Sequence, residues 1–254
     1  MASTRLIQRL AIAGVATLLS AGVLGRFSAL AAETAVPAPA PLVTAPASTA
    51  TETAVFAGGC FWGVQGVFQH VKGVTGAVSG YTGGTAATAT YDRVSGGDTG
   101  HAEAVRVTFD PRVVSYADLL RIYFSVVADP TTLNAQGPDH GTQYRTALFP
   151  TNAAQARVAA AYIAQLGKAK LWPRPIVTRI ERAQAFYPAE GYHQDYLTRH
   201  PDAAYIRIND APKVDALKTL YPASYRAQPV LVRGVIDTPP RAGLGGASRP
   251  ISRS

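Results

Sequence analysis

The chain is 254 residues long, carries a formal net charge of +8 and contains a single cysteine. Residues 51–226 hold 17 basic and 14 acidic side chains, so most of the positive excess lies at the two ends and does not indicate a nucleic-acid surface. One cysteine and five scattered histidines give no metal-ligand spacing, so we expect neither a metal nor an internal disulfide.

The first 31 residues have the pattern of a secretion signal. Arg5 and Arg9 precede an apolar run over residues 10–25, and Ala29-Leu30-Ala31 is a small-residue cleavage site. The run is somewhat short for a membrane span, so we expect cleavage after Ala31, with an uncleaved anchor as the alternative. Cleavage would export the protein, to the periplasm, without lasting membrane contact.

Composition divides the rest of the chain into a central domain and two flanking segments. Residues 32–51 are rich in Ala, Pro and Thr without an apolar period, which predicts a disordered linker. Residues 227–254 are rich in Pro, Gly, Arg and Ser and predict a disordered tail. Residues 52–226 are long enough for one domain with a hydrophobic core, and we expect a monomer.

A strand followed by a helix is predicted around the cysteine. Thr53–Ala57 has the composition of a short buried strand. Four apolar side chains then recur at helical spacing: Val64, Val67, Phe68 and Val71. The same spacing assigns Gln65 and Gln69 to the outer side of this helix.

Alternation and turn residues predict the later elements. The further strands are Val74–Tyr81, His101–Phe109, Tyr144–Phe149 and Ile176–Glu181. One helix begins after Ser115, with Asp118 completing a capping box, and a second begins at Asn152 and ends at Gly167. The order β-α-β-β-α-β predicts an α+β fold, a ferredoxin-like two-layer sandwich with long irregular loops and a C-terminal extension.

Cys60 lies in the predicted turn between the first strand and the first helix. Gly59 allows backbone and substrate to approach closely, and the helix N-terminus is expected to lower the pKa of the thiol. Phe61 and Trp62 supply apolar walls for a small, uncharged substrate group. A buried, inert cysteine is the alternative interpretation.

The run Gly58-Gly59-Cys60-Phe61-Trp62-Gly63 after an apolar strand resembles the signature of the A-type methionine sulfoxide reductases, the peptide-methionine (S)-S-oxide reductases. The resemblance extends over residues 53–226. It implies an elaborated two-layer fold and reduction of the S epimer of methionine sulfoxide, both free and in proteins. Such a reaction needs a thiolate nucleophile, a protonated acid near the sulfoxide oxygen and donors that polarise the S=O bond. Cys60 would be the nucleophile.

A second block, Tyr91 to Gly96 followed by Gly100 to Glu103, also resembles this family. The resemblance implies that Glu103 donates the proton and that the Tyr91 hydroxyl binds the sulfoxide oxygen. Composition alone favours a different interpretation, in which Glu103 is a solvated residue at a strand end.

Two later blocks complete the resemblance. The loop Gln136 to Arg145 implies Tyr144 as a second hydroxyl donor and Asp139 as an orienting residue. Without the resemblance these two would be a strand aromatic and a turn residue. The aromatic segment 186–196 implies that Tyr192 and His193 lie near the pocket, although a capping or packing role for His193 is equally consistent with the sequence.

Recycling differs from that of many family members, which carry further cysteines near the C-terminus. Cys60 has no partner in this chain, so its sulfenic acid would need an external thiol, either a small thiol or a thioredoxin-like protein, and no bound cofactor. Oxidised exported proteins would be the substrates. Two other functions remain open at this point: a cysteine hydrolase that pairs Cys60 with a histidine, and a non-enzymatic thiol-bearing binding module.

Overall fold

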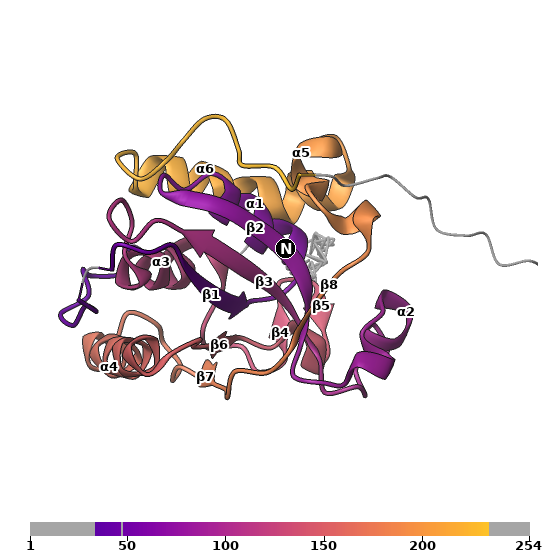
Figure 1. The fold of residues 1–254 in the computed structure, drawn as a ribbon, viewed down its shortest axis with the longest axis horizontal. Helices are drawn as coiled ribbons and strands as arrows, with labels where there is room; N and C mark the ends of the chain where they lie inside the picture. Colours follow the sequence, from indigo (N-terminus) through magenta and orange to yellow (C-terminus); the bar gives the residue numbers. More distant parts are fainter. Residues whose placement is uncertain (1–33, 47, 234–254) are drawn as a thin grey trace, which may run out of the picture.

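A six-stranded sheet is the centre of the computed structural model, which describes residues 34–46 and 48–233 (Figure 1). Its strands are β1 (Glu52–Ala57), β2 (Val74–Thr82), β3 (Ala102–Phe109), β6 (Ala147–Phe149), β7 (Arg179–Ile180) and β8 (Phe186–Pro188). They are arranged in the order β7-β6-β1-β3-β2-β8, and every neighbouring pair is antiparallel except β6 and β7. A separate two-stranded sheet pairs β4 (Ala135–Gln136) with β5 (Asp139–His140).

The four inner strands and two helices form the predicted ferredoxin-like core. The helices are α1 (Phe61–Gln69), between β1 and β2, and α3 (Tyr116–Ile122), between β3 and β6. This gives the chain order β-α-β-β-α-β and the spatial order β6-β1-β3-β2, so the fold prediction is confirmed. The short strands β7 and β8 extend the sheet at its two edges.

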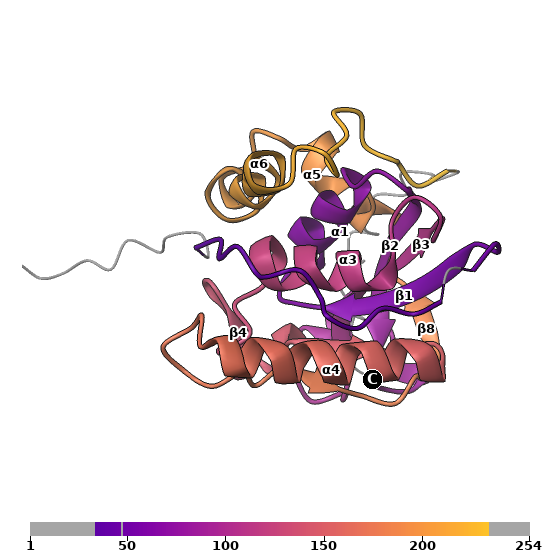
Figure 2. The same cartoon turned by 90° about the vertical axis from the view of Figure 1, so that its left-hand side faces the viewer.

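The other helices are α2 (Tyr91–Val94), α4 (Ala153–Ala169), α5 (Tyr196–Arg199), α6 (Ala211–Leu220) and the short η1 (Ala86–Thr88), η2 (Tyr123–Val127), η3 (Thr142–Tyr144), η4 (Gly191–His193) and η5 (Ile206–Asp210). Of these, α4, α5 and α6 cover the core from two sides (Figure 2). Both α5 and α6 pack on α1, and α4 packs on α3. In Figure 2, α5 and α6 lie above α1 while α4 lies below α3. No helix within the described ranges is long and apolar enough to cross a membrane.

The main core lies between the sheet and helices α1 and α3. The ring of Phe56 on β1 stacks on Phe68 of α1 at 4.7 Å and on Tyr123 at 5.6 Å, measured between centroids. Aromatic contacts of this kind join the strand before Cys60 to the helix after it. The predicted capping box is confirmed, because Ser115 Oγ accepts from the backbone N–H of Asp118, and the Asp118 carboxylate accepts from the Ser115 N–H.

Three predicted elements have different bounds in the structure. The strand expected from Tyr144 begins only at Ala147, because Tyr144 ends the η3 turn. Helix α4 continues past Gly167 to Ala169 and ends where Lys170 adopts a left-handed backbone, φ 49°. The strand expected over 176–181 pairs with β6 only at Arg179–Ile180, at the edge of the sheet.

The prediction that Gln65 and Gln69 lie on the outer side of the helix is wrong. Both side chains are buried under the segment that follows β8. Gln65 Nε2 donates to Ala77 O at 3.0 Å, and Gln69 Nε2 donates to Asp195 Oδ1 at 2.6 Å. Helix α1 is therefore covered on two sides, and the amide N–H groups of both glutamines are hydrogen-bonded inside the protein instead of facing solvent.

The predicted disorder of residues 32–51 is wrong for the described part of that segment beside α3 and α4. The Ala38 N–H donates to Ser125 Oγ at 3.0 Å, and Arg121 Nε donates to Ala38 O at 2.9 Å. Tyr162 of α4 donates its hydroxyl to Pro39 O at 2.8 Å. These hydrogen bonds satisfy the polar groups of an irregular backbone. Composition predicted disorder because the segment has no apolar period, and its hydrogen-bond partners are distant in the sequence.

The predicted tail also begins later than expected. The Val230 N–H donates to Gln69 O at 3.0 Å, and the Val232 N–H donates to Asp195 Oδ1 at 3.1 Å, so residues 230–232 belong to the folded domain. The predicted signal, 1–31, and the tail from residue 234 lie outside the described residues.

Candidate active site

Cys60 is held in a tight turn between β1 and α1, where it is the N-cap residue of the helix. Gly59 has a φ of +86°, and a Cβ added there would lie 2.6 Å from Cβ of Gln136. Gln136 cannot retreat, because its amide bonds to the Asp129 backbone N–H and C=O and to Thr132 Oγ1. Position 59 therefore requires glycine both for its backbone and for space.

The thiol opens into a cavity of about 280 Å³. Eight residues line it: Cys60, Phe61, Trp62, Tyr91, Glu103, Asp139, Tyr144 and Tyr205. The first seven were predicted as site residues from the sequence, and they come from separate stretches of the chain. The fold therefore brings together the cysteine, the carboxyl groups, the hydroxyl groups and the aromatic walls that the sequence assigned to one site.

Glu103 is a buried carboxyl group and not a solvated residue at a strand end. It is 2% exposed and stands on β3 between Ala102 and Ala104, both of which are fully buried. Burial raises its pKa to about 8, with the charges of Asp139 and Asp210 adding to this effect and the Phe61 N–H, which donates to Glu103 Oε2 at 3.0 Å, opposing it. The carboxyl group is therefore mostly protonated at neutral pH.

The predicted lowering of the Cys60 pKa is wrong for the unliganded site. Burial raises the pKa of the thiol well above its usual value, and the charges of Glu103 and Asp210 raise it further. The N–H of Trp62, in the first turn of α1, acts in the expected direction but is outweighed. The resting cavity therefore favours a neutral thiol beside a neutral carboxyl group.

Two phenol groups, Tyr91 and Tyr144, line the same cavity. Tyr91 begins α2, and Tyr144 ends η3. Burial raises the pKa of both hydroxyls, and the charge of Glu103 adds to this. Both remain protonated at physiological pH and can donate hydrogen bonds to a ligand oxygen.

Tyr205 also lines the cavity and was missed by the sequence analysis. Its hydroxyl donates to Asp139 Oδ2, which fixes the side chain expected to have an orienting role. The Tyr205 ring also meets Trp62 edge-on, with centroids 5.9 Å apart. Tyr205 stands 145 positions after Cys60 and belongs to none of the recognised blocks, so the sequence offered no local signal for it.

His193 lies behind the cavity wall and does not line the cavity. It is 2% exposed, and its Nδ1 accepts from Trp62 Nε1 at 3.2 Å. The His193 ring also packs against the ring of Tyr91, with centroids 4.7 Å apart, and against the ring of Tyr192, with centroids 4.2 Å apart. Burial lowers the pKa of His193 to about 4, so the ring is neutral and can accept the indole proton.

Two further residues that the sequence analysis did not single out support the aromatic wall. Tyr196 stacks on Trp62 with centroids 3.7 Å apart and an interplanar angle of 8°. Glu190 accepts from the backbone N–H of Tyr91 and from the hydroxyl of Tyr81, both at 2.9 Å. Trp62 and Tyr91 are thus positioned by the segment that follows β8.

The histidine arrangement argues against the hydrolase alternative. No histidine is among the residues that line the cavity at Cys60, so the described part of the chain holds no Cys–His pair there. Among the same residues, no three His, Cys, Asp or Glu side chains are grouped as metal ligands. A ferredoxin-like fold with one thiol, a protonated carboxyl group and phenols in a small aromatic cavity defines a thiol-dependent oxidoreductase.

Comparison with known sequences identifies the family. The family described as peptide methionine sulfoxide reductase matches residues 52–224, and the chain belongs to it. A peptide methionine sulfoxide reductase MsrA 2 of Mesorhizobium japonicum is 61% identical over 186 residues, which cover 73% of this chain and 95% of that protein. An MsrA of Deinococcus radiodurans is 52% identical, covering 68% of this chain and 83% of that protein.

Solved structures agree with this assignment. The reduced form of Mxr1 from Saccharomyces cerevisiae matches with a TM-score of 0.54 and 32% identity, covering 65% of this chain and 95% of that one. Methionine sulfoxide reductase A of Corynebacterium diphtheriae matches with a TM-score of 0.51 and 30% identity, covering 67% and 88%. The binding-module alternative is thereby set aside, because the chain is a member of an enzyme family.

Proposed function

We propose that this enzyme reduces methionine (S)-S-oxide, free and in proteins, to methionine by means of Cys60. The observation that carries the proposal is the shared cavity of the Cys60 thiol and the protonated, buried carboxyl group of Glu103. Attack of a thiol on a sulfoxide sulfur is assisted by a group that protonates the sulfoxide oxygen as negative charge develops on it. This cavity offers both groups at one site.

In the proposed reaction the Cys60 sulfur attacks the sulfoxide sulfur while Glu103 gives its proton to the oxygen. Glu103 then takes up the thiol proton, so no net charge remains in the cavity. The resulting hydroxyl group then moves from the substrate sulfur to the Cys60 sulfur as the S–O bond and the new S–S bond break, so Cys60 becomes a sulfenic acid and the substrate leaves as the thioether. The reaction therefore oxidises Cys60 by two electrons and reduces the substrate by two electrons.

Tyr91 and Tyr144 are proposed to hold the sulfoxide oxygen. Their raised pKa values keep the hydroxyl protons in place, so both can donate to the oxygen as negative charge develops on it. Asp139, held by Tyr205, is proposed to orient the polar side of the cavity. Gly59 does not line the cavity and would act indirectly, since its left-handed backbone and missing side chain let the turn that carries Cys60 pack against Gln136.

Phe61 and Trp62 are proposed to receive the substrate methyl group. Trp62 is fixed by stacking on Tyr196 and by its bond to His193, so its indole face is already ordered before substrate arrives. Tyr192 and His193 would therefore support the pocket from behind without touching the substrate.

Regeneration of Cys60 is proposed to use an external thiol and no bound cofactor. Cys60 is the only cysteine of the chain, so its sulfenic acid meets no second thiol within the same molecule. A small thiol or a thioredoxin-like protein would attack the Cys60 sulfur, release the oxygen as water and leave a mixed disulfide. A second thiol then restores Cys60.

A single-turnover experiment tests this function. With one equivalent of methionine (S)-sulfoxide and no reductant, the enzyme should release one methionine and gain one oxygen, which a sulfenic-acid reagent traps. Cys60→Ser should fold and show no reduction, since the serine hydroxyl is much harder to ionise. An unmodified thiol after one full turnover would contradict the sulfenic-acid route.

The pattern of residues 1–31 supports a further proposal, that the enzyme is exported to the periplasm and acts there as a monomer on oxidised exported proteins. Cell fractionation and N-terminal sequencing of the mature protein test it. The expected first residue is Ala32. A start at Met1 in a membrane fraction would favour the uncleaved anchor.

A further inference from the structure

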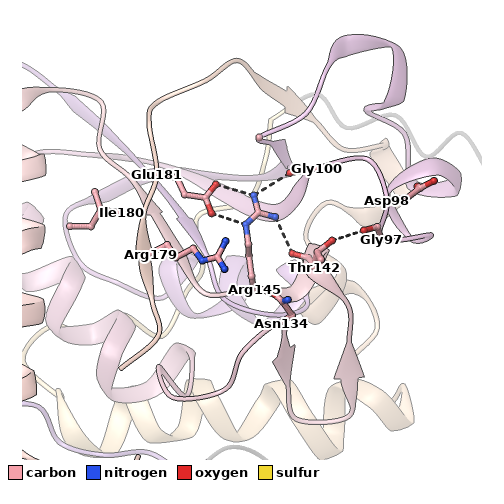
Figure 3. A pocket seen from close by; sticks show the side chains of 10 residues that line it. Gly97, Asp98, Gly100, Asn134, Thr142, Arg145, Arg179, Ile180 and Glu181 are labelled. Carbon is pink, nitrogen blue, oxygen red and sulfur yellow. Dashed lines mark hydrogen bonds and ion pairs between the residues drawn. The ribbon is translucent and has the colours of Figure 1, made fainter. Parts of the chain in front are cut away.

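Arg145 lies next to the catalytic cavity but is not among the residues that line it. Its side chain is 10% exposed and makes five hydrogen bonds; Figure 3 shows those to Glu181, Gly100 and Thr142. Nε and Nη2 donate to the two carboxylate oxygens of Glu181, at 2.8 and 3.0 Å. Nη2 also donates to Gly100 O at 3.2 Å, and Nη1 donates to His101 O at 3.2 Å and to Thr142 O at 3.0 Å. These bonds use all five N–H donors of a guanidinium group.

The carbonyl groups that Arg145 binds belong to the two segments that carry the polar site residues. Gly100 and His101 lead directly into β3, where Glu103 follows two residues later. Thr142 begins η3, which ends at Tyr144. The same turn is tied to the loop after α2, because Thr142 Oγ1 donates to Gly97 O at 2.5 Å.

We propose that Arg145 is a positioning residue that fixes the acid Glu103 and the donor Tyr144 relative to each other and to Cys60. This inference rests on the proposed function, since it concerns the geometry of the same reaction. Arg145 touches no cavity-lining residue in these five bonds, so it acts through the backbone of the two segments. Glu181, which directly follows β7, holds the guanidinium plane in place through its two carboxylate oxygens.

No other side chain can take over this role. A lysine at position 145 would have three donors on a single atom and would lose the planar arrangement that reaches two carboxylate oxygens and three carbonyls at once. Backbone packing is also tight here, because a Cβ added to Gly83 would lie 2.9 Å from Arg145 Nη2. The segment that follows β2, which begins at Gly83, therefore packs directly against the guanidinium group.

The proposed role predicts a specific kinetic effect. Phe61 and Trp62 belong to α1 and make no bond with Arg145, so binding of the substrate methyl should change little. The rate of the chemical step should fall strongly, because a displacement of about 1 Å can cost on the order of 10²-fold. The alkaline limb of that rate, expected near the Glu103 pKa of about 8, should move to lower pH as water reaches the carboxyl group.

The test measures the single-turnover rate, without reductant, for wild type, Arg145→Lys and Arg145→Ala. Both variants should lose roughly 10- to 100-fold in rate with substrate affinity within about threefold of wild type. Ethylguanidinium should restore part of the rate of Arg145→Ala, because Arg145 borders a solvent-open hollow of about 810 Å³. Arg179→Ala is the matched control, since Arg179 is an exposed arginine of the same hollow, and it should behave as wild type.

Glu181→Gln provides a second, milder variant if the arginine replacements fail to fold. This variant should retain the shape of the Arg145–Glu181 pair but weaken it. The single-turnover rate should fall severalfold, and the alkaline limb of its pH profile should move to lower pH. A folded Arg145→Lys or Glu181→Gln with wild-type rate and pH profile, whatever its thermal stability, would overturn the proposal. An inactive wild-type enzyme would instead refute the proposed function itself.

Discussion

The buried proton of Glu103 would link the proposed reaction of this enzyme to the stability of its fold. Burial raises the pKa of this carboxyl group from 4.5 to about 8 in the folded chain. One pKa unit corresponds to about 1.4 kcal/mol, so ionising Glu103 costs on the order of 5 kcal/mol of folding free energy. The pKa of Glu103 is higher in the folded than in the unfolded chain. The protonated carboxyl group therefore makes its full contribution to the free energy of unfolding below pH 4.5, and this contribution is lost as the pH rises through 8.

Glu103→Gln should remove this cost. The amide has nearly the shape of the carboxyl group, and its oxygen can still accept from the Phe61 N–H. The free energy of unfolding of this variant should equal that of wild type near pH 4 and exceed it by up to about 5 kcal/mol at pH 9. The rate of sulfoxide reduction should fall, because glutamine cannot release a proton. Glu103→Ala should lose more activity, about 10²- to 10⁴-fold, and should also leave the Phe61 N–H unpaired.

Urea unfolding at pH 4, 7 and 9 measures the effect, with Cys60→Ser in both chains so that the thiol does not titrate. Other groups that ionise over this range are the same in both chains and cancel in the difference. A stability difference that stays constant between pH 4 and pH 9 would show that Glu103 has an ordinary pKa. The carboxyl group could not then be the proton donor at neutral pH.

Three further predictions concern the cavity walls. Burial and then the charge of Glu103 raise the Cys60 pKa, so the pH midpoint of iodoacetamide alkylation should be lower in Glu103→Gln than in wild type. An unchanged midpoint would show that the charge of Glu103 does not act on the Cys60 thiol. Trp62→Ala should raise KM and lower kcat together by about tenfold or more, because the methyl pocket is lost, and an unaltered kcat/KM would place the indole away from the substrate. Tyr205→Phe should lower kcat/KM by about 10- to 100-fold through Asp139, and steady-state assays showing wild-type values would make their bond structural only.

The features that the sequence predicted correctly depend on neighbours along the chain. The strand before Cys60, the glycine turn and the capping box at Ser115 are each encoded within a few residues. The order of such local elements was enough to predict the ferredoxin-like core. The site blocks around Glu103 and Tyr144 were also visible, because each is a contiguous run.

What the sequence could not predict depends on contacts between distant segments. Helical spacing shows which face of α1 meets the sheet, but it cannot show that a second segment covers Gln65 and Gln69. The linker was misjudged for the same reason, since its partners Ser125 and Tyr162 lie about 90 and 120 positions away.

The error in the Cys60 pKa has the same origin and clarifies how the site would work. The helix N-terminus is a local feature, whereas the burial and carboxyl groups that outweigh it come from positions 103, 139 and 210. A neutral thiol reacts slowly with general oxidants, because the thiolate is the reactive form. The thiolate would then form only when a sulfoxide oxygen takes the proton of Glu103, because the Glu103 carboxylate left behind can accept the proton of the Cys60 thiol. Because the chain has one cysteine and no second thiol to reduce it, a Cys60 thiol that is activated only by its substrate would limit oxidation of Cys60 to productive turnovers.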